Sequence, residues 1–147
     1  PNDELIIKQI KRLPEKECVY SGPGGAILKK EIFETKKTFI HAHPGKLPEF
    51  KGSTTIYYSL LIEKNISVSV IELNEKIDGG DILRIEDFEF KKGSDLDYVI
   101  DPCVRALSLI RYFKNKIEKR KQNKEGDTFY IIHPVLKHLS ILKNKAY

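Results

Sequence analysis

The sequence predicts an α/β fold. Short segments rich in β-branched residues alternate along the chain with segments whose hydrophobic residues recur at helical spacing. Turns rich in glycine and proline follow the first two predicted strands, where a strand commonly gives way to a loop or a helix. The length of 147 residues, 40% of them hydrophobic, allows one domain with a core of its own.

Each expected element rests on a local pattern. Hydrophobic residues near helical spacing predict helices at 4–13, 26–33 and 54–64. In the second helix, the residues expected to face inward are Ile27, Leu28, Ile32 and Phe33. Runs rich in β-branched or aromatic residues predict strands at 17–21, 38–42, 66–73 and 82–90. Ser53 is expected to cap the third helix and Asn65 to end it.

The last third of the chain is expected to hold a long helix and a tail. Ser94 and Asp95 open a helical stretch, which Asp101-Pro102 is expected to interrupt before starting a new helix. One hydrophobic stripe of that helix is expected to face the core, formed by Val104, Leu107, Ile110, Phe113 and Ile117. Residues 1–124 are expected to form one catalytic domain, and residues 125–147 a tail that packs on it.

Composition excludes several classes of protein. No hydrophobic run approaches the roughly 18–20 residues of a membrane span, and no secretory pattern opens the chain. Cys18 and Cys103 are too few and too far apart to predict a disulfide framework or a metal site. The net charge is +5, but the one dense basic block, Lys114 to Lys124, is interpreted as a solvated helix end. We therefore expect a cytoplasmic protein that acts on neither nucleic acid nor membranes.

The segment 40–52 (IHAHPGKLPEFKG) carries the strongest signal of a functional site. His41 and His43 alternate in a predicted strand, so both side chains point to one face, with Cα atoms about 6.6 Å apart at a rise of ~3.3 Å per residue. Pro44 and Gly45 end the strand directly after them. The pair is therefore expected at the carboxyl end of the strand, where open α/β sheets bind ligands.

Two glycine-rich turns add to this signal. In 77–81 (IDGGD), the glycines permit a tight turn, and Asp78 supplies a carboxylate that can tune an imidazole or take a proton. The same letters are also a common signal of a plain hairpin. The turn 22–25 (GPGG) lies between a strand and a helix, where main-chain groups can hold a phosphate or a flat ring.

Together, HAHPGKLPEFKGSTTIYYSLL and KIDGGDIL resemble the catalytic signature of the 10-formyltetrahydrofolate-dependent formyltransferase family. That family includes the methionyl-tRNA, glycinamide ribonucleotide and sugar N-formyltransferases. The resemblance covers roughly residues 17–90 and implies part of a Rossmann-like α/β catalytic domain, with a mixed, mostly parallel sheet and flanking helices. It also implies an enzyme that transfers a formyl group from 10-formyltetrahydrofolate, as donor, to a primary amine.

The resemblance assigns roles to particular residues. It places the catalytic histidine on His43 and the catalytic acid on Asp78, with His41 assisting. The residues expected to bind the folate are Ser21, Gly22, Gly24, Gly25, Ile27, Leu28 and Gly79. The residues expected to form the loop at the substrate are Pro44, Gly45, Leu47, Pro48, Lys51 and Gly52. No bound metal is implied.

The chain departs from the family pattern in two ways. His41 stands where the family has asparagine, and a neutral imidazole replaces an amide donor only if its single N–H points the right way. Family members carry about half of their sheet before the glycine loop, so we expect the N-terminal half of the domain to be missing. The expected absence of a second, tRNA-handling domain favours an amino sugar or another small amine as the substrate.

Two other interpretations stay open on the sequence. His41, His43 and Asp78 form a competent ligand set for zinc or iron, which would make the protein a metal-dependent hydrolase. Alternatively, the chain is an inactive, truncated formyltransferase-like domain that binds a partner through exposed sheet edges.

Overall fold

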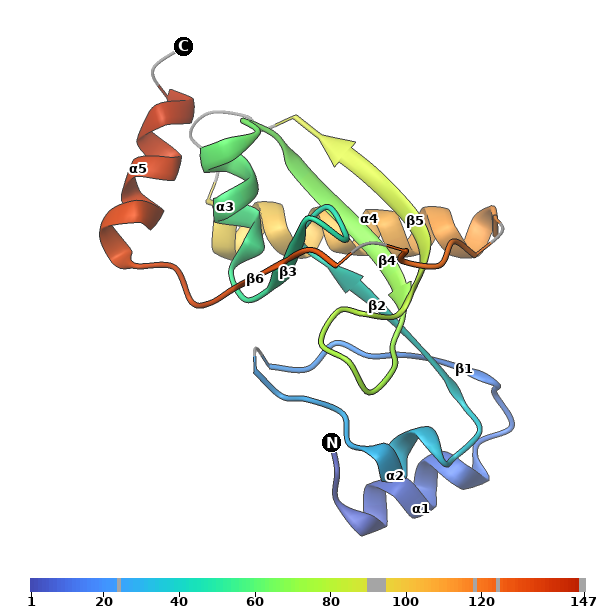
Figure 1. The fold of residues 1–147 in the computed structure, drawn as a ribbon. Coiled ribbons are helices and arrows are strands. Elements are labelled where there is room, and N and C mark those ends of the chain that lie inside the picture. Colours follow the sequence, from blue (N-terminus) through green and yellow to red (C-terminus); the bar gives the residue numbers. More distant parts are fainter. Residues whose placement is uncertain (24, 90–94, 118, 124, 146–147) are drawn as a thin grey trace.

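The structure is a computed structural model that describes residues 1–23, 25–89, 95–117, 119–123 and 125–145 (Figure 1). The strands are β1 (Glu17–Val19), β2 (Thr38–His43), β3 (Phe50–Gly52), β4 (Ile66–Glu72), β5 (Asp81–Phe88) and β6 (Asp127–Phe129). The helices are α1 (Glu4–Arg12), α2 (Lys30–Phe33), α3 (Thr55–Ile62), the π-helical turn η1 (Leu96–Ile100), α4 (Asp101–Lys114) and α5 (Pro134–Lys145). The α/β fold class predicted from the sequence is therefore confirmed.

The main sheet has the strand order β1-β2-β4-β5 and is mixed, as expected. The expectation of mostly parallel pairing was wrong for this sheet, because β1 and β2 pair in parallel whereas β2–β4 and β4–β5 are antiparallel. His43, the last residue of β2, pairs with Ser69 at the middle of β4, and Ile40 pairs with Glu72 at its end, so the chain enters β4 at the end of the sheet where it left β2. A short turn then joins β4 to β5, and such a connection can only produce an antiparallel pair.

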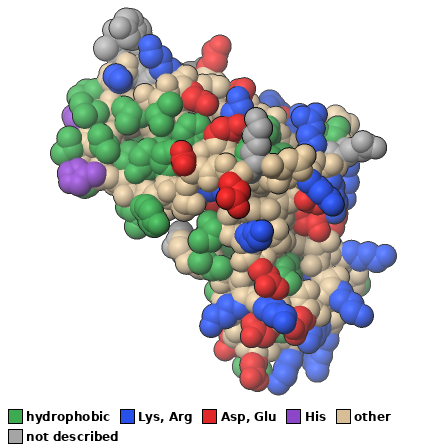
Figure 2. Space-filling model, in the orientation of Figure 1, with side chains coloured by type: hydrophobic (Ala, Val, Ile, Leu, Met, Phe, Trp, Pro, Cys, Tyr) green, Lys and Arg blue, Asp and Glu red, His purple; other side chains and the backbone are tan. Residues whose placement is uncertain are grey.

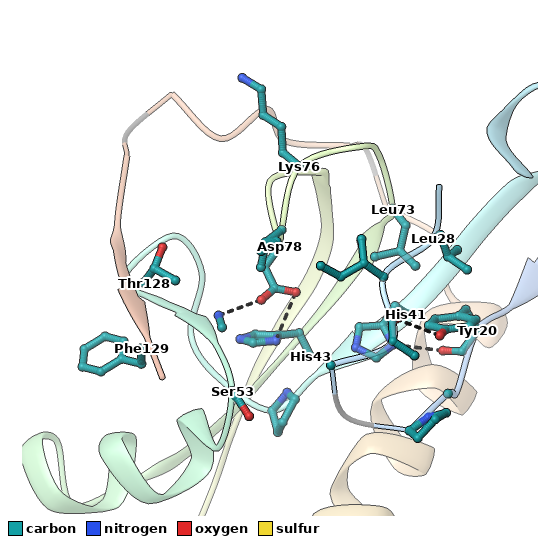
Figure 3. Close-up of a pocket in the computed structure, with 18 of the residues that line it drawn as sticks. Tyr20, Leu28, His41, His43, Ser53, Leu73, Lys76, Asp78, Thr128 and Phe129 are labelled. Atoms are coloured by element: carbon teal, nitrogen blue, oxygen red, sulfur yellow. Dashed lines mark hydrogen bonds and ion pairs between the residues drawn. The ribbon is translucent and has the colours of Figure 1, made fainter. Parts of the chain in front are cut away.

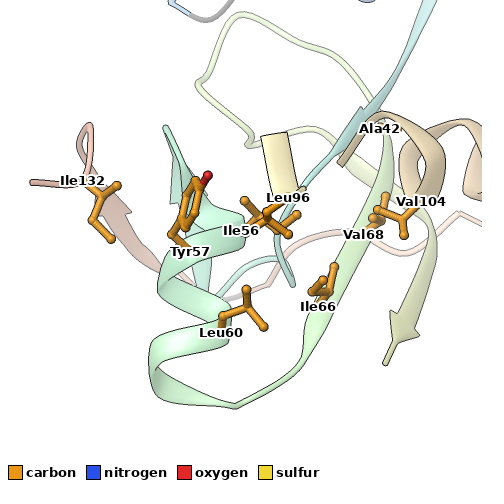
Figure 4. Close-up of a cluster of buried hydrophobic side chains, with 9 residues drawn as sticks. All are labelled: Ala42, Ile56, Tyr57, Leu60, Ile66, Val68, Leu96, Val104 and Ile132. Carbon is orange, nitrogen blue, oxygen red and sulfur yellow. The ribbon is translucent and has the colours of Figure 1, made fainter. Parts of the chain in front are cut away.

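The core lies between the sheet and the helix α4, which crosses one face of the sheet (Figure 1). Residues 66–71 of β4 are all buried, because α4 covers one face of this strand and the loop after β2 covers the other. Figure 4 shows the largest buried cluster, formed by Ala42, Ile56, Tyr57, Leu60, Ile66, Val68, Leu96, Val104 and Ile132. This packing fixes the end of β2, where the two histidines lie.

The hydrophobic stripe expected on α4 was largely wrong. Val104 is buried, but Leu107, Ile110 and Phe113 are 43%, 50% and 41% exposed, and Ile117 lies beyond the end of the helix. The buried face consists instead of Val104, Ser108 and Tyr112. The buried residues are spaced by four, which is close to the 3.6 residues of a helical turn, so they stay near one face. The residues of the expected stripe are spaced by three from Val104 to Phe113, so their positions rotate progressively around the helix.

The helix expected from Asp101-Pro102 does begin there, as α4, but the expected interruption before it was wrong, and Asp101 is not its N-cap. The turn η1 runs directly into α4, and Asp101 has helical backbone angles. The opening cap is Asp95, whose side chain accepts from the backbone N–H of Tyr98. Ser94 lies outside the described residues.

Two short helices begin and end elsewhere than expected. The N-cap of α3 is Thr54 and not Ser53, and Thr54 adopts a left-handed conformation with φ +53°. Its hydroxyl accepts from the backbone N–H of Ile132, so this end of α3 is held by the C-terminal segment. The C-cap is Glu63, two residues before Asn65. The helix α2 starts later than predicted, and of the residues expected to face inward, Ile27 is exposed.

The basic block Lys114–Lys124 does not continue α4, which ends at Lys114. Among its described residues, Lys116 pairs with Glu17 and Lys119 pairs with Glu72. The backbone of Arg120 forms a short bridge with Ile82 at the edge of β5. The block therefore ties the edges of the sheet to the segment that leads to β6.

The C-terminal segment returns to the body of the protein. The strand β6 pairs in parallel with β3, and α5 contacts α3. Lys137 of α5 forms an ion pair at 2.6 Å with Asp97, which also accepts a hydrogen bond from Tyr57 of α3. Figure 2 shows hydrophobic side chains gathered where α3 and α5 lie. The division into residues 1–124 and 125–147 stays a prediction. In the described part of the chain, no helix has the length and apolar character to span a bilayer.

Candidate active site

A pocket of about 370 Å³ opens at the carboxyl end of β2 (Figure 3). His41 and His43 both line it, as expected for alternate residues on one face of a strand. Asp78 enters from the turn between β4 and β5, and the segment 128–130 closes the opposite side. The volume falls within the range of sites for small organic ligands.

His43 is 2% exposed, and its two ring nitrogens face different partners. Nε2 donates to the carbonyl of Phe50 at 2.6 Å. Since a carbonyl only accepts, this bond fixes a proton on Nε2. Nδ1 lies 3.4 Å from Oδ1 of Asp78, so the imidazole and the carboxylate face each other.

Asp78 is held in place by groups on two other segments. Its Oδ2 accepts from the backbone N–H of Gly52 at 2.8 Å, and its carbonyl accepts from the side-chain amide of Gln122 at 2.8 Å. Gln122 also donates to the carbonyl of Gly80 at 2.7 Å. The backbone of Asp78 is left-handed, with φ +46°, a conformation that aspartate tolerates better than most residues. The turn therefore presents the carboxylate at a fixed position beside His43.

The His43–Asp78 pair is suited to hold one proton. With Nε2 protonated, a neutral His43 turns the lone pair of Nδ1 toward the carboxylate, and a proton between the two atoms removes that repulsion. Burial lowers the pKa of His43 below its ordinary value, while the Asp78 carboxylate and the Phe50 carbonyl oppose this shift. Once protonated, His43 is therefore a stronger acid than an ordinary histidine. The carboxylate of Asp78 lies beside it and can stabilise its positive charge.

His41 has a different arrangement. Its Nδ1 donates to the carbonyl of Tyr20 at 2.9 Å, which fixes the proton of the neutral ring on Nδ1. Burial lowers the pKa of His41, and the hydrogen bond to Tyr20 opposes the shift. A neutral His41 therefore has no N–H on Nε2, and this tautomer is not the one that would replace an amide donor.

The loop after β2 is anchored by a buried serine. Ser69 of β4 donates to the carbonyl of Gly45 at 2.7 Å and accepts from the backbone N–H of Leu47 at 3.0 Å. Gly45 packs so closely that a Cβ there would lie 2.8 Å from Nε2 of His43. The position of the loop therefore determines the position of the imidazole.

We expect Ser69→Ala to lower the free energy of unfolding by about 1–3 kcal/mol, because it leaves a buried donor and a buried acceptor unpaired. Ser59→Ala is the matched control. Ser59 is equally buried, but its Oγ has no hydrogen-bond partner among the described residues, so its removal should change stability by less than about 0.5 kcal/mol. Urea unfolding of both variants measures the difference, and equal effects would show that Ser69 does not hold the loop.

The described part of the structure does not support the interpretation of the protein as a metal-dependent hydrolase. Among the described residues, no three histidine, cysteine, aspartate or glutamate side chains are grouped so that they could hold an ion. Both nitrogens of His43 already face protein groups, and Nδ1 of His41 is bound to Tyr20.

The residues predicted to bind ligands fall into two groups. Those that line the pocket are Gly22, Gly25, Ile27, Leu28, Pro44 and Gly52. Those that do not line it are Ser21, Gly45, Leu47, Pro48, Lys51 and Gly79. Leu47 is instead a core residue, 1% exposed and packed on Ile71. Gly24 lies outside the described residues.

Several pocket residues had not been predicted: Tyr20, Leu73, Lys76, Arg105, Thr128, Phe129 and Tyr130. Arg105 donates to the carbonyl of Ala42 at 2.8 Å and pairs with Asp101 at 3.3 Å, one turn earlier on α4. Asp101 and Arg105 are four residues apart in a predicted helix, and this spacing alone indicates that their side chains can form an ion pair. Nothing in the sequence near residues 128–130 indicates that they reach the pocket, because their position depends on the pairing of β6 with β3.

Comparisons with known proteins find curated proteins of similar sequence, but no protein-family model matches this chain. The methionyl-tRNA formyltransferase of Rickettsia bellii is 32% identical over 111 residues, which are 71% of this chain and 36% of that protein. The chain therefore spans about a third of the length of that curated relative.

Solved structures are similar in fold. A sugar N-formyltransferase from a Shewanella species superimposes with a TM-score of 0.66 at 18% identity, covering 96% of this chain and 64% of that one. A formyltransferase from Anoxybacillus kamchatkensis, in complex with UDP-4,6-dideoxy-4-formamido-L-AltNAc and tetrahydrofolate, gives a TM-score of 0.59 at 20% identity, covering 72% and 60% of the two chains.

Proposed function

We propose that this chain, which is related to the formyltransferases over part of their length, transfers a formyl group from 10-formyltetrahydrofolate to a primary amine. The observation that carries the proposal is the His43–Asp78 pair at the pocket, with Nδ1 and Oδ1 3.4 Å apart. Formyl transfer to an amine develops negative charge on the carbonyl oxygen, and an enzyme must supply a donor at that oxygen. In this proposal His43 supplies the donor in its protonated form, in which Nδ1 carries a proton and the Asp78 carboxylate beside it stabilises the charge.

The pocket supports a flat, partly apolar formyl donor. Tyr20, Leu28 and Leu73 line the side next to His41, and the turn after β1 brings main-chain groups to the same side. Tyr20 is held by hydrogen bonds from its backbone N–H to Ile40 and from its hydroxyl to Ala26. These residues would hold the folate, which supplies an activated formyl group, and the neighbour from Anoxybacillus kamchatkensis was solved with tetrahydrofolate.

A small amine is the proposed acceptor, with an amino sugar as the first candidate. The wall opposite the histidines consists of Thr128, Phe129 and Tyr130, which offer hydroxyl and aromatic groups and no cations. Two basic side chains, Lys76 and Arg105, line the pocket, and Arg105 is already engaged by Ala42 and Asp101. This lining favours a hydroxylated acceptor such as an amino sugar, although the relative from Rickettsia bellii is named for methionyl-tRNA.

The test is an assay of the purified chain with 10-formyltetrahydrofolate and a panel of acceptors. The panel contains nucleotide-linked amino sugars and methionyl-tRNA, and mass spectrometry detects the formamide product. We expect transfer to an amino sugar, and Asp78→Asn should lose it while still binding a folate analogue. Transfer to methionyl-tRNA alone would contradict the proposed substrate class. Tight folate binding without transfer to any amine would support the non-catalytic interpretation instead.

A further inference from the structure

We propose that Nε2 of His41 takes the proton that the acceptor amine loses and returns it to the departing nitrogen of the formyl donor. This inference rests on the proposed formyl transfer. His41 stands where the family pattern has asparagine. An asparagine amide cannot take up and release a proton near pH 7, so this role would be specific to the histidine.

The first support is the fixed tautomer. The carbonyl of Tyr20 can only accept, so the bond of 2.9 Å from Nδ1 of His41 keeps the proton of the neutral ring on Nδ1. The backbone N–H of Tyr20 donates to the carbonyl of Ile40 at 2.8 Å, so this acceptor is itself held against β2. The other nitrogen, Nε2, therefore carries a lone pair, and no hydrogen bond to it is found among the described residues.

The second support is the position of the ring. His41 lines the same pocket as His43, and Figure 3 shows it between His43 and Tyr20. The ring centroids of His41 and Tyr20 lie 6.1 Å apart. The base and the His43–Asp78 pair therefore flank one space, as a reaction with a charged oxygen on one side and a proton to remove on the other requires.

The third support is the charge around the ring. Arg105 on α4 and His43 on β2 disfavour a positive charge on His41, whereas Asp78 on the β4–β5 turn favours it. Burial, which has the largest effect, acts with Arg105 and His43 to keep the pKa of His41 below its ordinary value of 6.5, against the opposing effects of Asp78 and of the hydrogen bond to Tyr20. The ring is therefore neutral near pH 7, which is the form that can accept a proton.

The proposed step is balanced in atoms and charge. As the amine nitrogen bonds to the formyl carbon, Nε2 of His41 takes the proton from that nitrogen, and the carbonyl oxygen becomes negative beside the His43–Asp78 pair. When the carbonyl double bond forms again, the bond from carbon to the donor nitrogen breaks. That nitrogen then takes the proton from Nε2, and His41 is neutral again. His41 thus carries the proton in both directions, while the His43–Asp78 pair stabilises the charged oxygen.

The first measurement is the tautomer of His41 by NMR of the ¹⁵N-labelled chain. At pH 7 we expect a protonated Nδ1 and an unprotonated Nε2, with signals assigned by comparison with His41→Gln. This readout does not depend on activity. A proton on Nε2 at pH 7 would overturn the inference and leave the proposed function standing.

The second measurement is the dependence of kcat on pH for the wild type, His41→Asn and His41→Ala. The wild type should lose activity as the pH falls through the pKa of His41, below 6.5, because protonated Nε2 cannot accept. His41→Asn should be about a hundredfold slower and lack this acid limb. Free imidazole should restore part of the rate of His41→Ala, and His138→Asn, on the exposed side of α5, should behave as the wild type.

These outcomes separate the two proposals. If His41→Asn transfers as fast as the wild type with the same acid limb, the role of His41 is wrong and formyl transfer stands. If the wild type transfers to no amine, the proposed function and this inference both fall.

Discussion

Replacing His43 by alanine is expected to lower kcat for formyl transfer by about a thousandfold. The substitution removes Nδ1, which faces Asp78, and with it the proton available to the carbonyl oxygen. Asp78→Ala should have nearly the same effect, because His43 then lacks the carboxylate that takes up its charge. Rapid-quench or steady-state assays with an amino-sugar acceptor measure both.

The control for these two variants is the binding of a folate analogue. His43 is buried and bonded to Phe50, so its loss could loosen the loop after β2 as well as remove the chemistry. A Kd that stays within about threefold of the wild type, together with an unchanged far-ultraviolet spectrum, assigns the loss to the chemical step. A His43→Ala variant with the full rate would show that the pair does not act in the reaction.

A large effect on stability is expected from Gly52→Ala. Gly52 has φ +102°, and a Cβ there would lie 2.1 Å from the carbonyl oxygen of Phe129. An alanine must therefore push β6 away from β3, in addition to adopting an unfavourable backbone conformation. We expect a loss of at least about 3 kcal/mol in the free energy of unfolding. Activity should fall too, because the N–H of Gly52 holds Asp78.

Gly25→Ala is the matched control for the backbone part of this effect. Gly25 also has a positive φ, +82°, but a Cβ there would meet nothing within 4 Å. Its substitution should cost only the conformational strain, about 1 kcal/mol. Urea unfolding gives both values. If the two variants lost equal stability, the close approach of Phe129 to Gly52 would not be the cause.

Local patterns predicted the elements that carry the histidines. The alternation of His41 and His43 needs only the period of a strand, and Pro44 and Gly45 mark where that strand ends. The β-branched run at 66–73 predicted β4 to within one residue. The family resemblance then singled out Asp78 as the partner of His43, although the two residues are far apart in the sequence.

Features that depend on contacts between distant parts of the chain, such as the buried face of α4 and the tautomer of His41, could not be predicted from local patterns. The stripe on α4 was misplaced because hydrophobic residues occur on more than one face of that helix, and only the sheet decides which face is buried. The tautomer of His41 depends on the carbonyl of Tyr20, the residue that follows β1, twenty-one residues away. No local pattern encodes such a contact.

The parallel ladder between β3 and β6 has a consequence for biosynthesis. A ribosome releases the histidine strand and the aspartate turn long before it releases Thr128 to Tyr130, which complete the wall of the cavity. A nascent polypeptide therefore encloses a ligand only after residues 128–130 have emerged, and the contact of Gln122 with the Asp78 turn also forms late. Folate added during translation should protect chains that include residues 128–130 from protease and leave shorter, ribosome-bound intermediates unprotected.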